Sequence, residues 1–466
     1  MNAPTLTASH AQILTVAAAF FLEVLDATVM IVAIVPMAND INASISEVTL
    51  SLATYVLALA VFTPLSGYLF NPLGLAGKFQ AGLLIFFVGS WVCALSPDLL
   101  TLCFARFIQG FGSALIVPAG RALILSYTPK HHMPRTMAWL IAPALTAPMA
   151  APYIATLMLG AGGWRMIFVF VALLAVGLFI ACRLWLRSLP SPLSQPSTLN
   201  RPAYALWSLF CGALFMVFVF SSTHQGYFAA IAAIWTLVGG ALLTLTLRYA
   251  RHTTLFDLTL LNNPLFKLNL MSGSLFRISI YAFPTLLIIG LMKDADASAV
   301  FTGHCLFFIF AGNLLAKPVA VKLLTGCRHL KPFFIGASLA TTLSLGLFYN
   351  TRLIEEPITL WGLCFVHGCA RSVQFLGYST TSLWGIEQLR LHNATVLMSS
   401  VMQLNALIGQ SVPALLAAFY MPDRWLTGES DGTFFQVGLA TVTVLSLMTV
   451  LTAVCLPSAK RLSTPR

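Results

Sequence analysis

Apolar runs about as long as a membrane is thick recur along almost the whole chain. A transmembrane helix needs about 20 consecutive, mostly apolar residues. Fourteen such helices are predicted, at residues 12–36, 48–70, 79–96, 99–125, 137–160, 164–187, 204–222, 227–247, 268–291, 298–321, 330–349, 357–382, 393–420 and 433–456. We therefore expect an all-α polytopic membrane protein.

The amino-acid composition points the same way. Of the 466 residues, 58% are hydrophobic and only 8% are charged, whereas a soluble globular protein carries about 25% charged residues. This composition excludes a water-soluble enzyme, a disordered regulator and a nucleic-acid binder. The net charge of +11 is typical of loops beside a membrane in a chain this apolar. The nine cysteines form no C-x-x-C pair, so neither a disulfide framework nor a metal site is expected.

Polar stretches divide the predicted helices into groups of six, two and six. Prolines and serines between 188 and 203 would leave backbone groups unsatisfied in hydrocarbon, so this stretch is a predicted linker. The N-terminus has no features of a removable signal peptide. The predicted segments are an N-terminal six-helix bundle (1–187), a cytoplasmic linker (188–203), two additional transmembrane helices (204–247), a cytoplasmic connection (248–267), a C-terminal six-helix bundle (268–456) and a cytoplasmic tail (457–466).

The loops between these helices alternate in charge. One set holds 17 of the 25 lysines and arginines, Lys78 and Arg121 among them. The other set holds ten of the 14 acids and only four basic residues. Because basic loops stay in the cytoplasm, both termini are expected to be cytoplasmic.

Six charged residues remain inside the predicted helices, and they are Glu23, Asp26, Arg106, Arg277, Lys317 and Arg371. A charge at the bilayer centre costs at least about 2.5–3.5 kcal/mol, so such residues usually face a cavity and have partners. Asp26 and Arg106 are predicted at overlapping depths, which favours a pair between them.

Glu23 and Asp26 are three residues apart and share one face of a helix. Two neighbouring carboxylates cannot both ionise comfortably in a medium of low dielectric constant, so one is expected to hold a proton. This arrangement predicts a proton-binding site. The alternative is that Asp26 is only the ionic partner of Arg106, while Glu23 reaches toward the interface.

The intramembrane charges leave an excess of positive charge. Burying a cation without a counter-charge costs free energy unless an anion binds beside it. Arg277 and Arg371 are therefore predicted to face a substrate that can be anionic. The alternative is that backbone carbonyls and water satisfy both arginines. Lys317 lies close to Lys322 and either joins the same cavity or extends to the interface.

Other polar residues inside the predicted helices are candidates for substrate contact. Gln109, Gln403 and Asn405 could bind a ligand, although such groups also hold helices together. His367 is interpreted as a packing histidine rather than a proton relay. The sequence Arg371-Ser372-Val373-Gln374 repeats the R-x-x-Q of Arg106-Phe107-Ile108-Gln109, a match short enough to arise by chance.

Three short stretches resemble a known family. Leu25-Asp26-Ala27-Thr28-Val29 with Pro36 is similar to the L-D-x-T…P signature of helix one in fourteen-span drug:proton antiporters of the major facilitator superfamily. Arg106-Phe107-Ile108-Gln109-Gly110-Phe111-Gly112 resembles the R-x-x-Q-G-x-G motif of helix four, and Pro118 and Arg121 follow it as in the MdtD-type subgroup. Gly163-Trp164-Arg165-Met166-Ile167-Phe168 is similar to the W-R-W-I-F opening of helix six.

The resemblance implies the major facilitator fold, which here consists of two six-helix bundles and two extra helices. The two bundles would rock around a binding site at the middle of the membrane. It also implies that Asp26 and Arg106 take part in protonation and coupling. Glu23 stands where relatives often have a neutral residue, so its role is inferred from this sequence alone.

Two motifs depart from the family pattern and bear on gating. The loop motif G-x-L-A-D-R-x-G-R-K keeps its glycines as Gly67 and Gly74, but Asn71 replaces the aspartate. The charged contact by which this loop usually holds the two bundles in one conformation is therefore not expected. The antiporter motif G-P-x-x-G of helix five keeps its helix-bending prolines as Pro148 and Pro152, with alanines in place of glycines. These five residues are the predicted gating positions.

The sequence thus predicts a proton-coupled exporter of small amphipathic organic molecules, of the multidrug-efflux type, which works by alternating access. It is expected in the bacterial inner membrane as a functional monomer that contacts lipid and a small-molecule substrate but no nucleic acid. No cofactor is expected, since no nucleotide-binding motif is present and the proton gradient supplies the energy. One alternative is an exporter of an anionic carboxylate metabolite or carboxylate siderophore. Another is a non-coupled facilitator or a transporter-derived sensor. A membrane enzyme has no support from a nucleophile or metal cluster.

Overall fold

A computed structural model describes residues 9–66, 68–128, 133–186, 199–223, 228–250, 258–294, 299–327, 329–349, 356–382, 386, 391–420 and 433–454. The regular structure in these residues is helical. The α-helices are α1 (His10–Ile41), α2 (Ile45–Leu65), α3 (Gly74–Leu95), α4 (Leu99–Ser126), α5 (Met133–Gly162), α6 (Arg165–Trp185), α7 (Arg201–Thr223), α8 (Phe228–Ala250), α9 (Pro264–Asp294), α10 (Ala299–Leu315), α11 (Lys317–Gly326), α12 (Leu330–Gly346), α14 (Pro357–Thr381), α15 (Leu391–Tyr420) and α17 (Thr433–Val454). Short 3₁₀ helices lie at Asn71–Leu73, Leu258–Asn262 and Leu347–Tyr349.

These helices follow the predicted spans one for one, with one exception. The span predicted at 298–321 is divided into α10 and α11, which meet at Ala316. Pro318, in the first turn of α11, has no N–H and disfavours an unbroken helix just before it. Among the described residues, ten helices are long and apolar enough to cross a membrane. The all-α polytopic membrane fold predicted from the sequence is therefore confirmed.

Local sequence signals set several helix starts. Ser9 and Ser44 each form a capping box, with Gln12 and Glu47 respectively. At the start of α4, the carboxylate of Asp98 accepts a hydrogen bond from the backbone N–H of Thr101 at 2.8 Å. That bond favours the charged carboxylate and holds the pKa of Asp98 below its ordinary value.

Two residues counted with the cations of the cytoplasmic loops lie on helices. Lys78 is in the first turns of α3, is 3% exposed, and its Nζ donates to the backbone oxygen of Ser66 at 3.3 Å. Arg121 is on α4, within the helix predicted at 99–125. The helix α3 begins at Gly74, before the predicted run at 79–96, because the aliphatic stem of a lysine can be buried while its charged group finds a polar partner.

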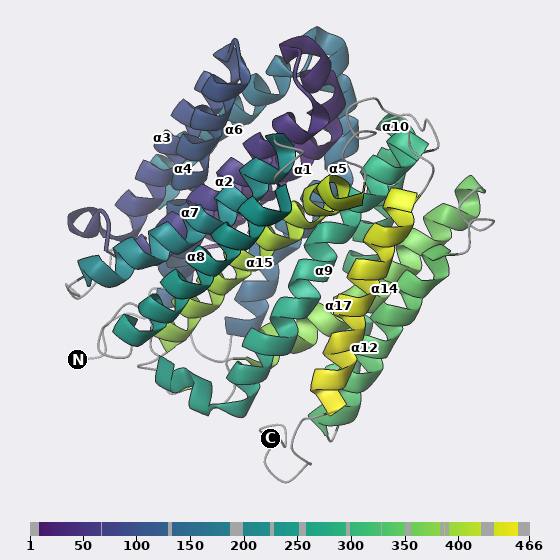
Figure 1. Ribbon diagram of the computed structural model, residues 1–466. Coiled ribbons are helices and arrows are strands. Elements are labelled where there is room, and N and C mark those ends of the chain that lie inside the picture. Colours follow the sequence, from purple (N-terminus) through teal and green to yellow (C-terminus); the bar gives the residue numbers. More distant parts are fainter. Residues whose placement is uncertain are drawn as a thin grey trace. The chain divides into compact units, whose positions relative to one another are not determined.

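The chain divides into two compact units. Unit 1 comprises Met1–Val219 and Trp235–Leu255, and unit 2 comprises Phe220–Ile234 and Phe256–Arg466. In unit 1, α3 lies beside α4 and α6 (Figure 1). The indole Nε1 of Trp207 on α7 donates to the backbone oxygen of Ala60 on α2 at 2.9 Å. The first part of α7 is therefore attached to the N-terminal bundle.

In unit 2, α9, α17, α12 and α14 lie side by side (Figure 1). A core cluster centred on Phe283, Leu286 and Leu287 of α9 packs against Ile309 of α10 and Cys364 of α14. This core holds α14, which carries Arg371, one of the predicted substrate residues.

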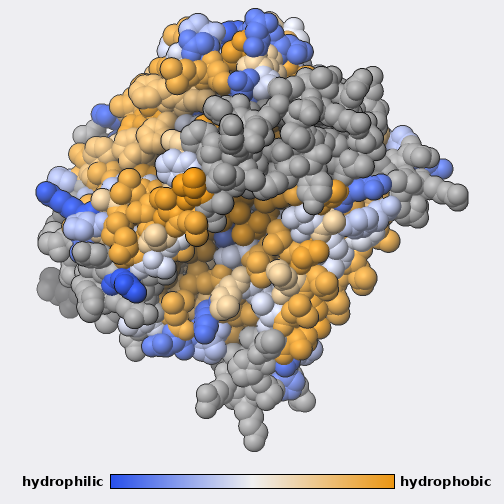
Figure 2. All heavy atoms as spheres, in the orientation of Figure 1, coloured by the Kyte–Doolittle hydropathy of each residue, from blue (hydrophilic) through white to orange (hydrophobic). Residues whose placement is uncertain are grey.

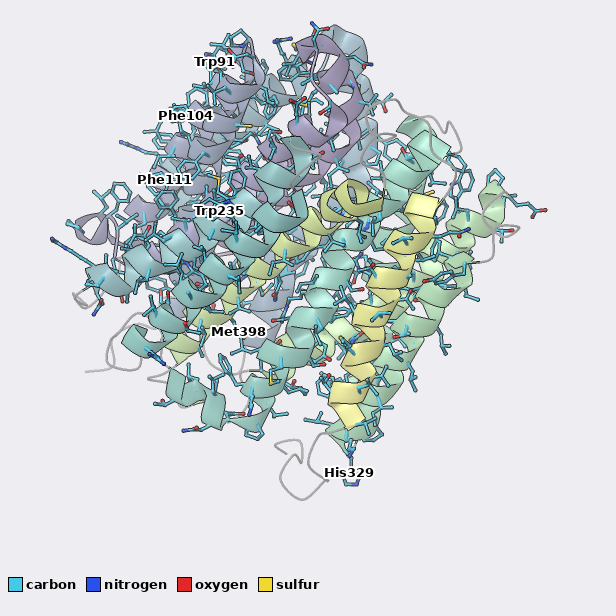
Figure 3. All side chains as sticks on the ribbon, in the orientation of Figure 1. Trp91, Phe104, Phe111, Trp235, His329 and Met398 are labelled. Atoms are coloured by element: carbon cyan, nitrogen blue, oxygen red, sulfur yellow. The ribbon has the colours of Figure 1, made fainter. Side chains whose placement is uncertain are left out.

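Large apolar side chains are exposed along the helices. Figure 2 shows extensive apolar surface on the face it draws. Trp91 on α3 and Phe104 on α4 are 44% and 63% exposed and point away from the bundle (Figure 3). Such a surface is costly in water and suits contact with lipid.

The predicted opening of helix six joins three helix ends in unit 1. Arg165 forms an ion pair with Asp40 at the end of α1, and Trp164 Nε1 donates to the same carboxylate at 2.9 Å. Arg165 Nη2 also donates to the backbone oxygen of Ser96, just after α3, at 3.0 Å. Gly163 precedes them with a φ of 83°, a conformation that glycine adopts without strain.

Candidate functional site

A fully buried ion pair lies inside unit 1. The Nη1 atom of Arg106 on α4 is 2.6 Å from Oδ2 of Asp26 on α1, and both side chains have 0% exposed surface. The predicted pairing of these two residues is therefore present. Charges removed from water in this way depend on each other for stabilisation.

Gln109 links the ion pair to a third helix. Its Nε2 donates to Oδ1 of Asp26 at 2.8 Å and to Oγ of Ser90 on α3 at 2.9 Å. Its Oε1 accepts from Arg106 Nη1 at 2.5 Å. Gln109 was predicted to contact substrate, but its amide is fully engaged and its side chain has no exposed surface. We therefore assign Gln109 to the ion-pair cluster.

Aromatic rings surround the guanidinium of Arg106. Its Cζ lies 4.4 Å from the centroid of the Tyr55 ring and 6.0 Å from that of Phe168. The hydroxyl of Tyr55 is 2.7 Å from Oγ of Ser113. Among the described residues Arg106 Nε and Nη2 have no hydrogen-bond partner, so the ring faces supply part of the electrostatic compensation.

The glycines of the helix-four motif explain how these groups come together. A Cβ atom on Gly110 would lie 2.5 Å from the backbone oxygen of Tyr55 on α2, and one on Gly112 would lie 2.5 Å from the backbone nitrogen of Phe86 on α3. On the α3 side, a Cβ on Gly89 would lie 2.6 Å from the backbone nitrogen of Gln109. Only glycine permits such close approach of α4 to α2 and α3, and this approach brings Gln109 within reach of Ser90.

Glu23 lies close to the ion pair but is less deeply buried. It is half-buried on α1, and its carboxylate is within electrostatic range of Asp26 and of Arg121 on α4. Arg121 is also half-buried, and its Nε has no hydrogen-bond partner among the described residues. Arg121 is thus a further cation near the predicted proton site, which its assignment to a loop had hidden.

In unit 2 the predicted substrate residues have different environments. Arg277 is 3% exposed, and its guanidinium donates to Oδ1 of Asn269 at 2.6 Å and to the Asn269 backbone oxygen at 3.4 Å. Asn405 Nδ2 donates to Oγ of Ser274 at 3.0 Å, so it holds α15 to α9. Gln403 is half-buried on α15. The structure brings neither Gln403 nor Asn405 into hydrogen-bond contact with Arg277.

Arg371 is less well compensated than Arg277. It is 6% exposed, and its Nε and Nη1 have no hydrogen-bond partner among the described residues. Its Cζ lies 5.1 Å from the centroid of the Phe310 ring. Lys317, on α11, lies within electrostatic range of Arg371, with its Nζ 5.3 Å from the ring of Phe375.

Two other residues of α14 have clear structural partners. His367 Nδ1 is 3.0 Å from Oγ of Ser344 on α12, and the imidazole packs on Phe283. Gln374 Nε2 donates to Oγ of Ser338 on α12 at 2.9 Å. Both contacts join α14 to α12.

The predicted gating positions are only partly described. Gly67 lies outside the described residues, and for Asn71 only its place in a 3₁₀ helix is described. Gly74 begins α3 with a φ of 66°, which favours glycine. Pro148 and Pro152 are buried within α5, which packs along α1.

Sequence reasoning missed three members of the cluster, Ser90, Tyr55 and Ser113. Isolated serine and tyrosine residues in apolar helices carry no distinctive spacing, so only the packing of α2, α3 and α4 identifies them. Among the described residues no group of three or more histidine, cysteine, aspartate or glutamate side chains could hold a metal ion. The chemistry available to the cluster is proton binding at a carboxylate whose charge is balanced by an arginine.

Comparison with known proteins gives consistent matches over most of the chain. The family model described as Major Facilitator Superfamily matches residues 16–375. A relative from Escherichia coli O139:H28 named "Putative multidrug resistance protein MdtD" is 26% identical over 440 residues, which cover 94% of this chain and 92% of the relative. Proteins of the same name from Cronobacter sakazakii and Shigella flexneri serotype 5b are each 27% identical, over 94% and 88% of this chain and 92% and 86% of theirs.

Proposed function

The chain belongs to the major facilitator superfamily, and from this premise we propose that it is a proton-coupled exporter of small amphipathic organic molecules. The relatives carry multidrug resistance in their names, which supports a substrate of that class. In this proposal the protein lies in the bacterial inner membrane with both termini in the cytoplasm, works as a monomer and needs no cofactor. It acts as a transporter and not as an enzyme.

The fully buried Asp26–Arg106 pair carries the proposal. In a region of low dielectric constant, the attraction between two charges 2.6 Å apart is strong, and it is lost when a proton neutralises the carboxylate. Protonation of Asp26 would leave Arg106 without its counter-charge and would weaken the contact between α1 and α4. A proton can thereby shift the balance between two arrangements of the helices.

Glu23 is the proposed point of proton entry. It lies three residues before Asp26 on the same face of α1 and is more exposed than Asp26. The charge of Arg121 would stabilise Glu23 in its ionised form, and that of Asp26 would oppose it. Such competition allows a proton to pass between the two carboxyl groups as their surroundings change.

Proton movement in proteoliposomes tests the proposal. Purified protein is reconstituted under an imposed pH gradient, and lumenal pH and dye uptake are followed after addition of ethidium, a cationic amphipathic dye. We expect ethidium-driven proton movement in the wild type, its loss in Asp26→Asn and its reduction in Glu23→Gln. Glu47→Gln is the matched control, because glutamine can retain the capping box at the start of α2.

Two outcomes would overturn the proposal. Ethidium flux in the wild type without proton movement would identify a non-coupled facilitator. Proton coupling that survives in Asp26→Asn would remove Asp26 from the coupling path.

A further inference from the structure

Arg371 repeats the position of Arg106 within a shared local architecture. Both arginines lie three residues before a buried glutamine, on α4 and α14 respectively. Gln109 donates to Ser90 on the neighbouring α3, and Gln374 donates to Ser338 on the neighbouring α12, each at 2.9 Å. The shared contact shows that the two R-x-x-Q segments are structural counterparts and not a chance match of letters.

The two counterparts differ in their counter-charge. Arg106 has the carboxylate of Asp26, whereas Arg371 has no ion pair in the described part of the chain and keeps two unpaired nitrogen atoms. A second cation, Lys317, lies within electrostatic range of Arg371 and adds to the excess of positive charge. Arg277 also has no ion pair in the described part of the chain and one unpaired nitrogen, Nε, but Asn269 accepts two of its hydrogen bonds.

We propose that Arg371 and Lys317 form a binding site for the carboxylate of a small aromatic organic anion. The proposal rests on the transport function given above and adds aromatic carboxylates to its amphipathic substrates. The planar fork of the arginine matches the two oxygen atoms of a carboxylate, and the lysine supplies a second positive charge. The rings of Phe310 and Phe375, which lie beside the two cations, provide an apolar surface for an aromatic body.

The depth of Arg371 distinguishes a free organic anion from a lipid headgroup. Arg371 lies fourteen residues after Pro357 and ten residues before Thr381, the two ends of α14. At a rise of 1.5 Å per residue, it is about 21 Å and about 15 Å from the two ends of the helix. Lipid phosphates lie outside the hydrocarbon core, so they are far from this guanidinium.

Ligand binding to the full-length protein in detergent tests the site without a proton gradient. The probes are 1-naphthoate, benzoate and phenyl phosphate, and the measurement is the dissociation constant by calorimetry. We expect 1-naphthoate to bind the wild type and Arg371→Gln to weaken that binding by about tenfold or more, as the loss of a charge-assisted hydrogen-bond pair implies. Arg371→Lys should bind with intermediate affinity, because it keeps the charge but not the fork.

Lys317→Gln provides a second test if Arg371→Gln does not fold, because Lys317 is half-buried and tolerates substitution more readily. It should also weaken 1-naphthoate binding. Lys322→Gln is the matched control, since Lys322 is an exposed cation on the same helix. This variant should bind 1-naphthoate with the affinity of the wild type.

Three outcomes would overturn the site. They are no binding of 1-naphthoate or benzoate by the wild type, equal affinities in the wild type and Arg371→Gln, and binding of phenyl phosphate alone. Because binding is measured without transport, loss of proton coupling with intact naphthoate binding would contradict only the proposed function. Intact proton coupling together with absent naphthoate binding would contradict only this site.

Discussion

Arg106 on α4 and Asp26 on α1 meet at 2.6 Å in a region of unit 1 that has no exposed surface. Eighty residues of sequence separate them. Gln109 contacts both partners and ties them to Ser90 on α3, so the pair belongs to a network of three helices. Such a network is stabilising only while each member keeps its partners.

Loss of either charge of this pair should destabilise the protein. Asp26→Asn and Arg106→Gln are each expected to lower the free energy of unfolding by about 3–5 kcal/mol, because each leaves the opposite charge buried and unpaired. The double variant should lose less than the sum of the two, with a coupling energy of about 0.5–3 kcal/mol. Denaturation of all four proteins in detergent measures this cycle, and additive losses would show that the pair contributes no mutual stabilisation.

Gly89→Ala should separate α3 from α4. The new methyl group would meet the backbone nitrogen of Gln109 at 2.6 Å, so the helices must shift at a cost of about 1–3 kcal/mol. Gly177→Ala is the matched control, because nothing lies within 4 Å of a Cβ on Gly177 in α6. Alanine should stabilise that helix by about 0.5–1 kcal/mol. Thermal unfolding of the two variants measures the difference, and equal midpoints would contradict the close approach of α3 and α4.

Trp207→Phe should loosen the attachment of α7 to α2. The variant loses the hydrogen bond from the indole to Ala60, which is worth about 1 kcal/mol, along with part of the buried ring. Trp91→Phe is a suitable control, since Trp91 on α3 is 44% exposed. Hydrogen exchange of α7 should accelerate in Trp207→Phe and remain unchanged in the control. Unchanged exchange of α7 in both variants would argue that this contact does not hold the helix.

The first turn of α4 should depend on pH through Asp98. Its carboxylate accepts the Thr101 N–H and its pKa is lowered on folding, so its contribution to stability is present above the ordinary value of 3.8. That contribution is lost as the pH falls through the lowered value. Amide exchange of Thr101 in the wild type, compared with Asp98→Ala at each pH, should show protection at pH 6 that disappears in strong acid. Equal exchange of the two proteins at pH 6 would contradict the cap.

The sequence was most informative about single helices, because a helix forms its backbone hydrogen bonds within its own segment. Fourteen apolar runs predicted fourteen spans, and the single departure, the break between α10 and α11, has a proline beside it. The charge of Arg106 and Asp26 also revealed their pairing, because buried charges demand partners. Sequence reasoning was wrong to place Lys78 in a loop, since α3 begins before the apolar run that identifies it. It also counted Arg121 with the loop cations, although the predicted helix at 99–125 contains this residue.

The sequence by itself determined that the chain crosses a membrane as helices and that few charges remain there. The reason is local, because every backbone hydrogen bond of a membrane helix lies within its own segment. Only the tertiary structure decided that Gln109 belongs to the ion pair and that Ser90 and Tyr55 complete it. It also decided that Arg371, among the residues the structure describes, has no carboxylate partner such as its counterpart has. These relationships depend on how closely helices distant in sequence approach one another, and that distance is set by glycines whose neighbours no local pattern reveals.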